Sequence, residues 1–167
     1  MDAIKALLDR RSVRIFKDEP VKKEDLETIL NAGLWAPSGA NRQLLKFVVV
    51  TDPEVKKAVC DACPGNTFMP MAPVTVIVIG DMNKKGTPLE DGSAAVENMM
   101  IAATALGYGT CWIGSHGNDR GAAFKKICNF PENYETMAAL SIGVPADELP
   151  ERAGRAPLDT VVVCNKF

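Results

Sequence analysis

The stretch Arg10-Arg11-Ser12-Val13-Arg14 places three guanidinium groups and one hydroxyl group within five consecutive residues. It follows a short apolar pattern and precedes the turn signal Glu19-Pro20. An arginine side chain stays charged and presents a planar set of donors that matches a phosphate group. The stretch is therefore either a solvated charged surface or one wall of an anion site, and the rest of the sequence has to distinguish the two.

The composition is that of an ordinary globular domain. The 167 residues are 47% hydrophobic and 24% charged, which suits one domain (1–167) with a sizeable core. The formal net charge is −2, from 19 basic and 21 acidic residues. A chain this balanced is a poor candidate for non-specific nucleic-acid binding. The basic cluster is therefore a local feature, which favours a binding site over a general polycation.

Cysteine usage and the first residues indicate a cytoplasmic protein. The five cysteines are irregularly spaced and odd in number, which is typical of reduced thiols and not of a disulfide framework. The first residues lack the apolar core of a secretory signal, and no apolar run reaches membrane-spanning length. Cys60 and Cys63 form a C-x-x-C pair at a predicted helix end, so we expect a structural role and no zinc site.

Apolar spacing predicts helices that alternate with a few strands. Helices are expected over 2–10, 21–35, 52–63, 90–106 and 119–128, and Asp52-Pro53 is a helix-start signal. β-Branched apolar runs predict buried strands over 47–51 and 74–80, further strands over 107–113 and 138–143, and a fifth short one over 161–164. No glycine-rich loop follows the first strand, so a Rossmann fold is disfavoured. Residues 145–167 contain three prolines and are expected to form an extended tail suited to pairing with a partner chain.

Residues 10–16, 36–43 and 106–114, in this order and at these separations, resemble the nitroreductase family of FMN-dependent NAD(P)H oxidoreductases. A weaker match covers 143–146 and 155–158, so the resemblance spans almost the whole chain. It implies an α+β fold in which helices flank a central mixed or antiparallel sheet. It also implies an intertwined homodimer with FMN at the subunit interface.

The resemblance assigns the FMN contacts to several walls. Arg10, Arg11 and Ser12 match positions at the phosphate and ribityl chain, and Arg14 matches the cation that faces the pyrimidine edge of the flavin. A loop that contacts the flavin bound mainly by the other subunit is matched by Pro37, Ser38, Gly39, Asn41 and Gln43. Backbone N–H groups that face N5 and O4 are matched by Ile113 and Gly114, with Cys111 and Trp112 lining the same side.

Two further positions complete the expected site. Arg155 matches a tail cation that reaches the phosphate, and Asn66 matches a position where some members contact the flavin. Ala153 stands near the place of a second family cation, for which Arg152 is the expected substitute.

The resemblance implies a ping-pong reaction. NADH or NADPH would reduce the flavin at N5, and an electron-poor acceptor such as a nitroaromatic, quinone or enone would then be reduced. No catalytic side chain and no metal is required, and His116, the only histidine, is expected in an exposed loop. The sequence leaves open the acceptor and the choice between NADH and NADPH.

Three alternatives also stay open. The protein could be a specialised member of the same superfamily, such as a reductive dehalogenase or a flavin-processing enzyme. It could be a flavin-binding or redox-sensing module without turnover. An anion-binding interaction domain built on the arginine cluster would bind no flavin at all.

Overall fold

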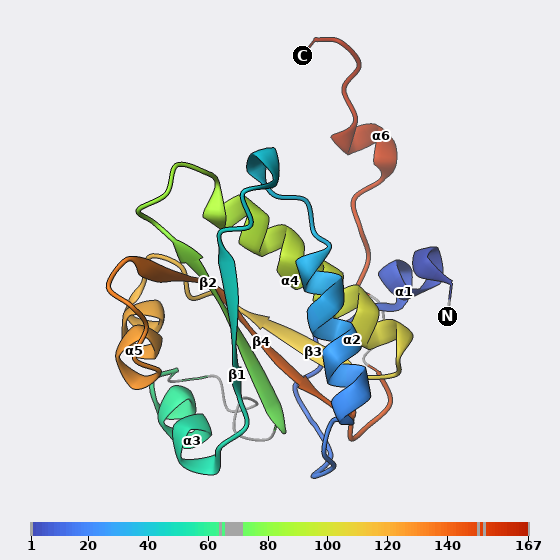
Figure 1. Cartoon of the computed structure of the whole chain (residues 1–167). Helices are drawn as coiled ribbons and strands as arrows, with labels where there is room; N and C mark the ends of the chain where they lie inside the picture. The colour runs from blue at the N-terminus through green and yellow to red at the C-terminus, as the bar shows by residue number, and fades with distance from the viewer. Residues whose placement is uncertain (1, 64, 66–71, 150, 152, 167) are drawn as a thin grey trace.

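A four-stranded antiparallel sheet forms the centre of the computed structural model, which describes residues 2–63, 65, 72–149, 151 and 153–166 (Figure 1). Its strands are β1 (Leu45–Val50), β2 (Val74–Asp81), β3 (Gly109–Ile113) and β4 (Tyr134–Gly143). They are ordered β1-β2-β4-β3 in space, and all three pairings are antiparallel. The α+β prediction is confirmed, although β4 starts at Tyr134 and not at residue 138.

Helices cover both faces of the sheet (Figure 1). The described helices are α1 (Ala3–Asp9), α2 (Lys23–Leu34), α3 (Pro53–Asp61), α4 (Pro88–Ala105), α5 (Asp119–Ile127) and α6 (Leu158–Val161), with a short 3-10 turn η1 (Gly39–Asn41). Neighbouring strand residues point to opposite faces, so alternate residues of β2 and β4 serve two separate cores. One core joins Val76 and Leu140 to α2 and α4, and the other joins Ile77 to α3 and α5.

The edge position of β1 limits its burial. Its residues are mostly half-buried or exposed, and only Val50 is fully buried. The expectation of a buried strand over 47–51 is therefore wrong for most of this stretch, because β1 has a neighbour on one side only. The expectation for 74–80 is confirmed, since every residue of β2 is buried.

The arginine stretch is laid in extended form against the end of the sheet. The Val13 N–H donates to the Thr110 carbonyl at 2.8 Å, and the Lys17 N–H donates to the Val144 carbonyl at 2.8 Å. Val13 and Phe16 are only 5% and 4% exposed. These backbone bonds and buried side chains fix Arg14, which lies between them, and anchor the end of the stretch that carries Arg10 and Arg11.

The close fit of this segment depends on Gly109. A Cβ atom added there would lie 2.7 Å from Cβ and Cγ2 of Val13, closer than real side chains pack. The missing side chain therefore lets residues 12–14 approach β3.

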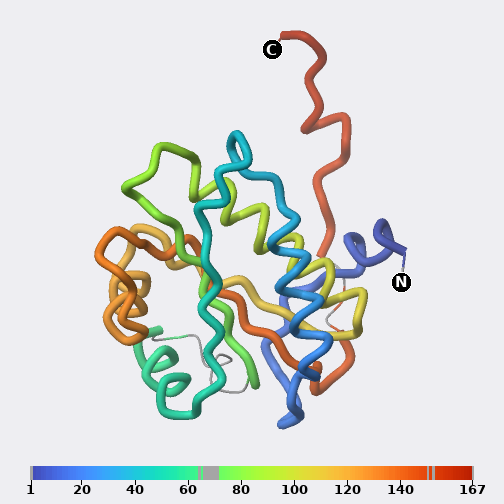
Figure 2. The backbone as a smooth tube through the Cα atoms, viewed as in Figure 1, coloured from blue at the N-terminus to red at the C-terminus, as the bar shows by residue number. Residues whose placement is uncertain are grey.

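The C-terminal tail leaves the domain and projects away from it (Figure 2). The predicted strand over 161–164 is wrong: Val161 ends α6, and the residues after it are not in a strand. A strand needs a neighbour for its backbone hydrogen bonds. The start of the tail has one, since Pro145 bridges Phe16 and the Ala146 N–H donates to the Ile15 carbonyl at 3.0 Å, but no described segment forms a β-pairing with residues 161–164. Its apolar side chains are exposed, with Leu158 at 76% and Val161 at 63%.

Among the described residues, we find no helix that is both long enough and apolar enough to span a membrane.

Candidate functional site

One pocket of about 510 Å³ gathers the arginine stretch and part of the tail. Its lining includes the three predicted phosphate-end residues, the predicted pyrimidine-edge cation, the predicted tail cation and two glutamates: Arg10, Arg11, Ser12, Arg14, Arg155, Glu97 and Glu151. Ala153 lines the same pocket, whereas Arg152 lies outside the described residues. The structure thus brings the predicted residues together, while their contacts with FMN stay a prediction.

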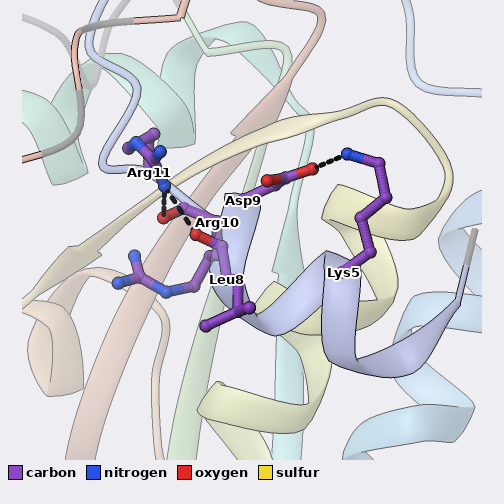
Figure 3. A network of polar contacts seen from close by, with 5 residues as sticks. All are labelled: Lys5, Leu8, Asp9, Arg10 and Arg11. Atoms are coloured by element: carbon purple, nitrogen blue, oxygen red, sulfur yellow. Dashed lines mark hydrogen bonds and ion pairs between the residues drawn. The ribbon is translucent and has the colours of Figure 1, made fainter.

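Arg10 and Arg11 are held in different ways, and their side chains point in different directions (Figure 3). The Arg11 guanidinium folds back over the end of α1, and its Nη1 donates to the Leu8 carbonyl at 2.9 Å and to the Arg10 carbonyl at 3.0 Å. Arg10 points away from this end, and its Nε lies 3.7 Å from Oε1 of Glu97 on α4. Arg11 therefore closes the helix end, while Arg10 joins that end to the middle of α4.

The charge and donors of this pocket suit an anion. Its four arginines outnumber its two glutamates. The Arg11 Nε is buried and has no hydrogen-bond partner among the described residues. An unmade bond at a buried donor is costly, so this N–H is a candidate contact for a bound anion. The donor set fits the phosphate end of FMN: Arg10, Arg11, Ser12 and Arg155 would hold the phosphate and ribityl chain.

The predicted loop wall lies at the start of α4, whereas the arginine pocket lies at its middle. A small pocket there, of about 40 Å³, is lined by Pro37, Ser38, Gln43 and Asp91 among others. Asp91 and Glu97 are separated by six residues of helix, which is about 9 Å along the axis. No described residue lines both this pocket and the arginine pocket. This separation agrees with a loop that serves the flavin of the other subunit, which stays a prediction.

The predicted β3 wall is corrected in one respect. Cys111 is 3% exposed and packs in the core beside α3 and α5, whereas Trp112 is 36% exposed on the opposite face. The expectation that both side chains line the same side is wrong, because successive strand residues alternate between faces. Gly114 is exposed, and a Cβ atom added there would meet nothing within 4 Å. Its backbone is therefore open to the close approach of a flat ring.

Arg14 lies near Cys111. Burial raises the pKa of the Cys111 thiol, and the positive charge of Arg14 opposes that rise. This links Arg14 to the β3 wall as well as to the arginine pocket. That Arg14 faces the redox end of the cofactor stays a prediction.

The remaining candidates do not add to the site. Asn66 lies outside the described residues. Burial raises the pKa of Cys60 to about 11, with Cys63 adding to the rise, so this pair has no stabilised thiolate. No group of three or more potential metal ligands occurs among the described residues. His116 is exposed as expected, and its Nδ1 lies 3.0 Å from the Thr136 carbonyl oxygen.

Two acidic residues near the predicted walls were missed by the sequence reasoning. Glu97 interrupts the Ala- and Met-rich helix pattern, and as the one charged residue of α4 after Asp91 it was a usable signal. Asp91 follows Glu90 at the start of α4 and resembles any acid in a first helical turn. Only the fold reveals that it is buried.

Comparison with known proteins gives a consistent answer. A sequence model of the nitroreductase family matches residues 7–68 and 61–144. A protein of Archaeoglobus fulgidus, provisionally named NADH dehydrogenase/NAD(P)H nitroreductase, is 34% identical over 152 residues, covering 88% of this chain and 87% of the relative.

Solved structures share the fold over almost all of this chain. An FMN-dependent nitroreductase from Clostridium difficile R20291 is 30% identical, with a TM-score of 0.91 and coverage of 98% of this chain and 99% of that one. An NADPH:FMN oxidoreductase from Vibrio harveyi, solved with NAD+, is 25% identical, with a TM-score of 0.89 and coverage of 99% and 77%. The sequence match, the shared architecture and the gathered arginines agree, and the chain belongs to the nitroreductase family.

Proposed function

We propose that the protein is an FMN-dependent oxidoreductase that uses NADH or NADPH to reduce electron-poor acceptors such as nitroaromatics, quinones or enones. The observation that carries the proposal is the arginine pocket, which joins residues from both ends of the chain around a cavity of about 510 Å³ with four arginines in its lining. The names of the relatives support it, since they include an FMN reductase from Bacillus subtilis and the FMN-dependent nitroreductase above.

FMN, when bound, supplies the redox chemistry by accepting a hydride from NAD(P)H and delivering it to the acceptor. The residues of this chain bind and tune the cofactor. Arg10, Arg11 and Ser12 hold the phosphate end with charge-assisted hydrogen bonds. Arg14 places a positive charge where negative charge develops on reduction. The N–H groups of Ile113 and Gly114 orient the reacting edge.

The site is proposed to be completed by a second copy of the chain. Large apolar side chains are exposed on α1, at the end of α2 and on the tail, and they include Ile4, Leu7, Leu34, Trp35, Leu158 and Val161. A monomer that exposes this much apolar surface usually has a partner. A homodimer would cover it and would bring the partner's Pro37–Gln43 loop to the flavin.

Purified protein tests the function directly. We expect a yellow protein with flavin absorption bands, and steady-state oxidation of NADH or NADPH that depends on a quinone or nitroaromatic. A colourless protein that stays without flavin after addition of FMN would refute the proposal. Flavin binding without turnover would instead identify a non-catalytic flavin module.

Sedimentation at micromolar concentration tests the assembly, with about 36 kDa expected for a dimer of 18.0 kDa chains. The described cysteines are all free thiols. They support a reducing, cytoplasmic location, which we include in the proposal.

A further inference from the structure

The loop 37–43 is held in a strained backbone conformation. Ala40, Asn41 and Gln43 have φ angles of 50°, 54° and 52°. These values lie in the left-handed region, which is unfavourable for residues with a side chain. Three such residues within one short loop persist only when surrounding contacts over-determine the conformation. The contacts that hold the loop therefore decide its shape.

Contacts within the loop account for part of its shape. The Gln43 N–H donates to Oγ of Ser38 at 3.3 Å, and the Gln43 side-chain amide donates to Oδ1 of Asn41 at 3.2 Å. Arg42 Nη1 donates to the Gly39 carbonyl at 3.0 Å. All these partners belong to the loop, so they shape it without fixing its place on the domain.

Asp91 connects the loop to α4. Its Oδ1 accepts the Gly39 N–H at 3.1 Å and the Thr87 hydroxyl at 3.0 Å. Asp91 is 5% exposed, and its other oxygen, Oδ2, is buried without a hydrogen-bond partner among the described residues. Burying a carboxylate costs folding free energy unless hydrogen bonds compensate for its lost hydration, and here only one of the two oxygens has such bonds. Its location in the first turn of α4 offsets part of that cost through the helix dipole.

The start of α4 is adapted to this connection. Thr87 occupies the N-cap position, yet its side chain makes no capping bond to the helix. Its hydroxyl donates to Asp91 instead. A Cβ atom added at Gly39 would lie 2.9 Å from the Thr87 Oγ1, so the loop is pressed against the helix start at this point.

We propose that Asp91 is a positioning residue that holds the 37–43 loop in the conformation that contacts the flavin. The inference rests on the proposed function, because it assumes that this loop is a flavin wall. In this role Asp91 requires no contact of its own with flavin or substrate. It acts through the Gly39 N–H and sets where Ser38 and Asn41 lie.

Three variants separate this role from a general contribution to stability. Asp91→Asn keeps an oxygen acceptor at the position, whereas Asp91→Leu removes it at similar volume. Glu90→Leu is the matched control, since Glu90 is an exposed acid of the same helical turn. In the flavin-free protein, hydrogen–deuterium exchange across residues 38–43 should quicken in Asp91→Leu and stay near wild type in Asp91→Asn and Glu90→Leu.

Flavin titration supplies the second readout. We expect the Kd for FMN to rise about tenfold in Asp91→Leu, the equivalent of one lost hydrogen bond to a charged group. Asp91→Asn should restore most of the affinity. Unchanged exchange in Asp91→Leu, or faster exchange with unchanged Kd, would overturn the role.

Two controls keep the test decisive. If wild-type protein binds no FMN, the proposed function fails, and the exchange comparison still decides whether Asp91 holds the loop. If Asp91→Leu does not fold, Thr87→Val removes one of the two donors and should show the same changes at smaller size. Normal exchange and normal Kd in Thr87→Val would then count against the inference.

Discussion

The arginine stretch 10–14 and the loop 37–43 are both predicted flavin walls, but they are built in opposite ways. The arginine stretch is extended, is bonded through its backbone to the sheet, and buries Val13. The loop has three residues with positive φ and is joined to α4 through the side chain of Asp91. The arginine stretch, which is predicted to bind the phosphate, is thus supported by the sheet. The loop, which is predicted to contact the flavin ring, depends on a few polar contacts.

The largest effect is expected when the arginine wall loses its charge. Arg10→Ala should raise the Kd for FMN about 10- to 100-fold, because a hydrogen bond to a charged group is worth about 1.5–3 kcal/mol. The loss also leaves Glu97, its ion-pair partner, unpaired in the pocket. Fluorescence titration measures it, and Lys5→Ala on the same helix is the control. Equal affinity in Arg10→Ala and Lys5→Ala would show that the arginine wall binds no phosphate.

The support of the arginine wall can be tested without touching a charge. Gly109→Ala would place a methyl group against Val13 and should destabilise the protein by about 1–3 kcal/mol through overpacking. Thermal unfolding measures this, and FMN affinity should fall in parallel. The double variant with Val13→Ala should lose less than the sum of the single variants, because the two side chains compete for one space. Strict additivity would mean that the contact does not position the stretch.

A further change should affect the flavin potential more than its binding. Arg14→Ala should shift the potential downward by about 30 mV, equivalent to about 1.4 kcal/mol for a two-electron couple. The reason is that a positive charge near the pyrimidine edge favours the reduced flavin. Spectroelectrochemistry measures the potential, with Arg10→Ala as the comparison. A potential that is the same in wild type and Arg14→Ala would refute the role assigned to Arg14.

The smallest effect lies outside both walls and concerns acid stability. The hydrogen bond from Asn133 lowers the pKa of Asp81 below its ordinary value of 3.8. A folded-state pKa below the unfolded one stabilises the fold above about pH 4, and this contribution is lost as the pH falls through the folded-state pKa. Wild type should therefore be slightly more stable than Asp81→Asn at pH 7, and this lead should be smaller at pH 3.

The unfolding midpoints of wild type and Asp81→Asn at pH 7 and pH 3 measure this difference in stability. Glu135→Gln, at an exposed position of β4, is the control. A lead of wild type over Asp81→Asn that is the same at both pH values would contradict the expectation. FMN affinity at pH 7 should be unchanged in Asp81→Asn, in contrast to the variants of the two walls.

Features that depend on a few neighbouring residues could be predicted from the sequence. Asp52 accepts N–H groups from Glu54 and Val55 at 3.0 Å, as the Asp-Pro start signal predicted. The gathering of Arg10, Arg14 and Arg155 in one pocket followed from the family resemblance, because no local rule joins positions so far apart in the chain.

Other features could not be predicted because they depend on contacts between residues far apart in the sequence. The tail looked like a strand because Val161, Val162 and Val163 are β-branched, but β structure needs a neighbour, and none of the described segments pairs with these residues. Asp91 looked like a surface acid because burial is decided by the loop that covers it. The opposite orientation of Cys111 and Trp112 was predictable from the two-residue period of a strand.

The attachment of residues 12–17 to the sheet also has a consequence for biosynthesis. Their backbone partners are Thr110, Val144 and Ala146, which are translated long after them. Such long-range pairings form late, since the intervening chain must first be made and ordered. The arginine pocket is thus unfinished on the ribosome until β3 and β4 have emerged and paired. A nascent chain stalled before residue 110 should bind no flavin, even though three of the four arginines that line the pocket have already been translated.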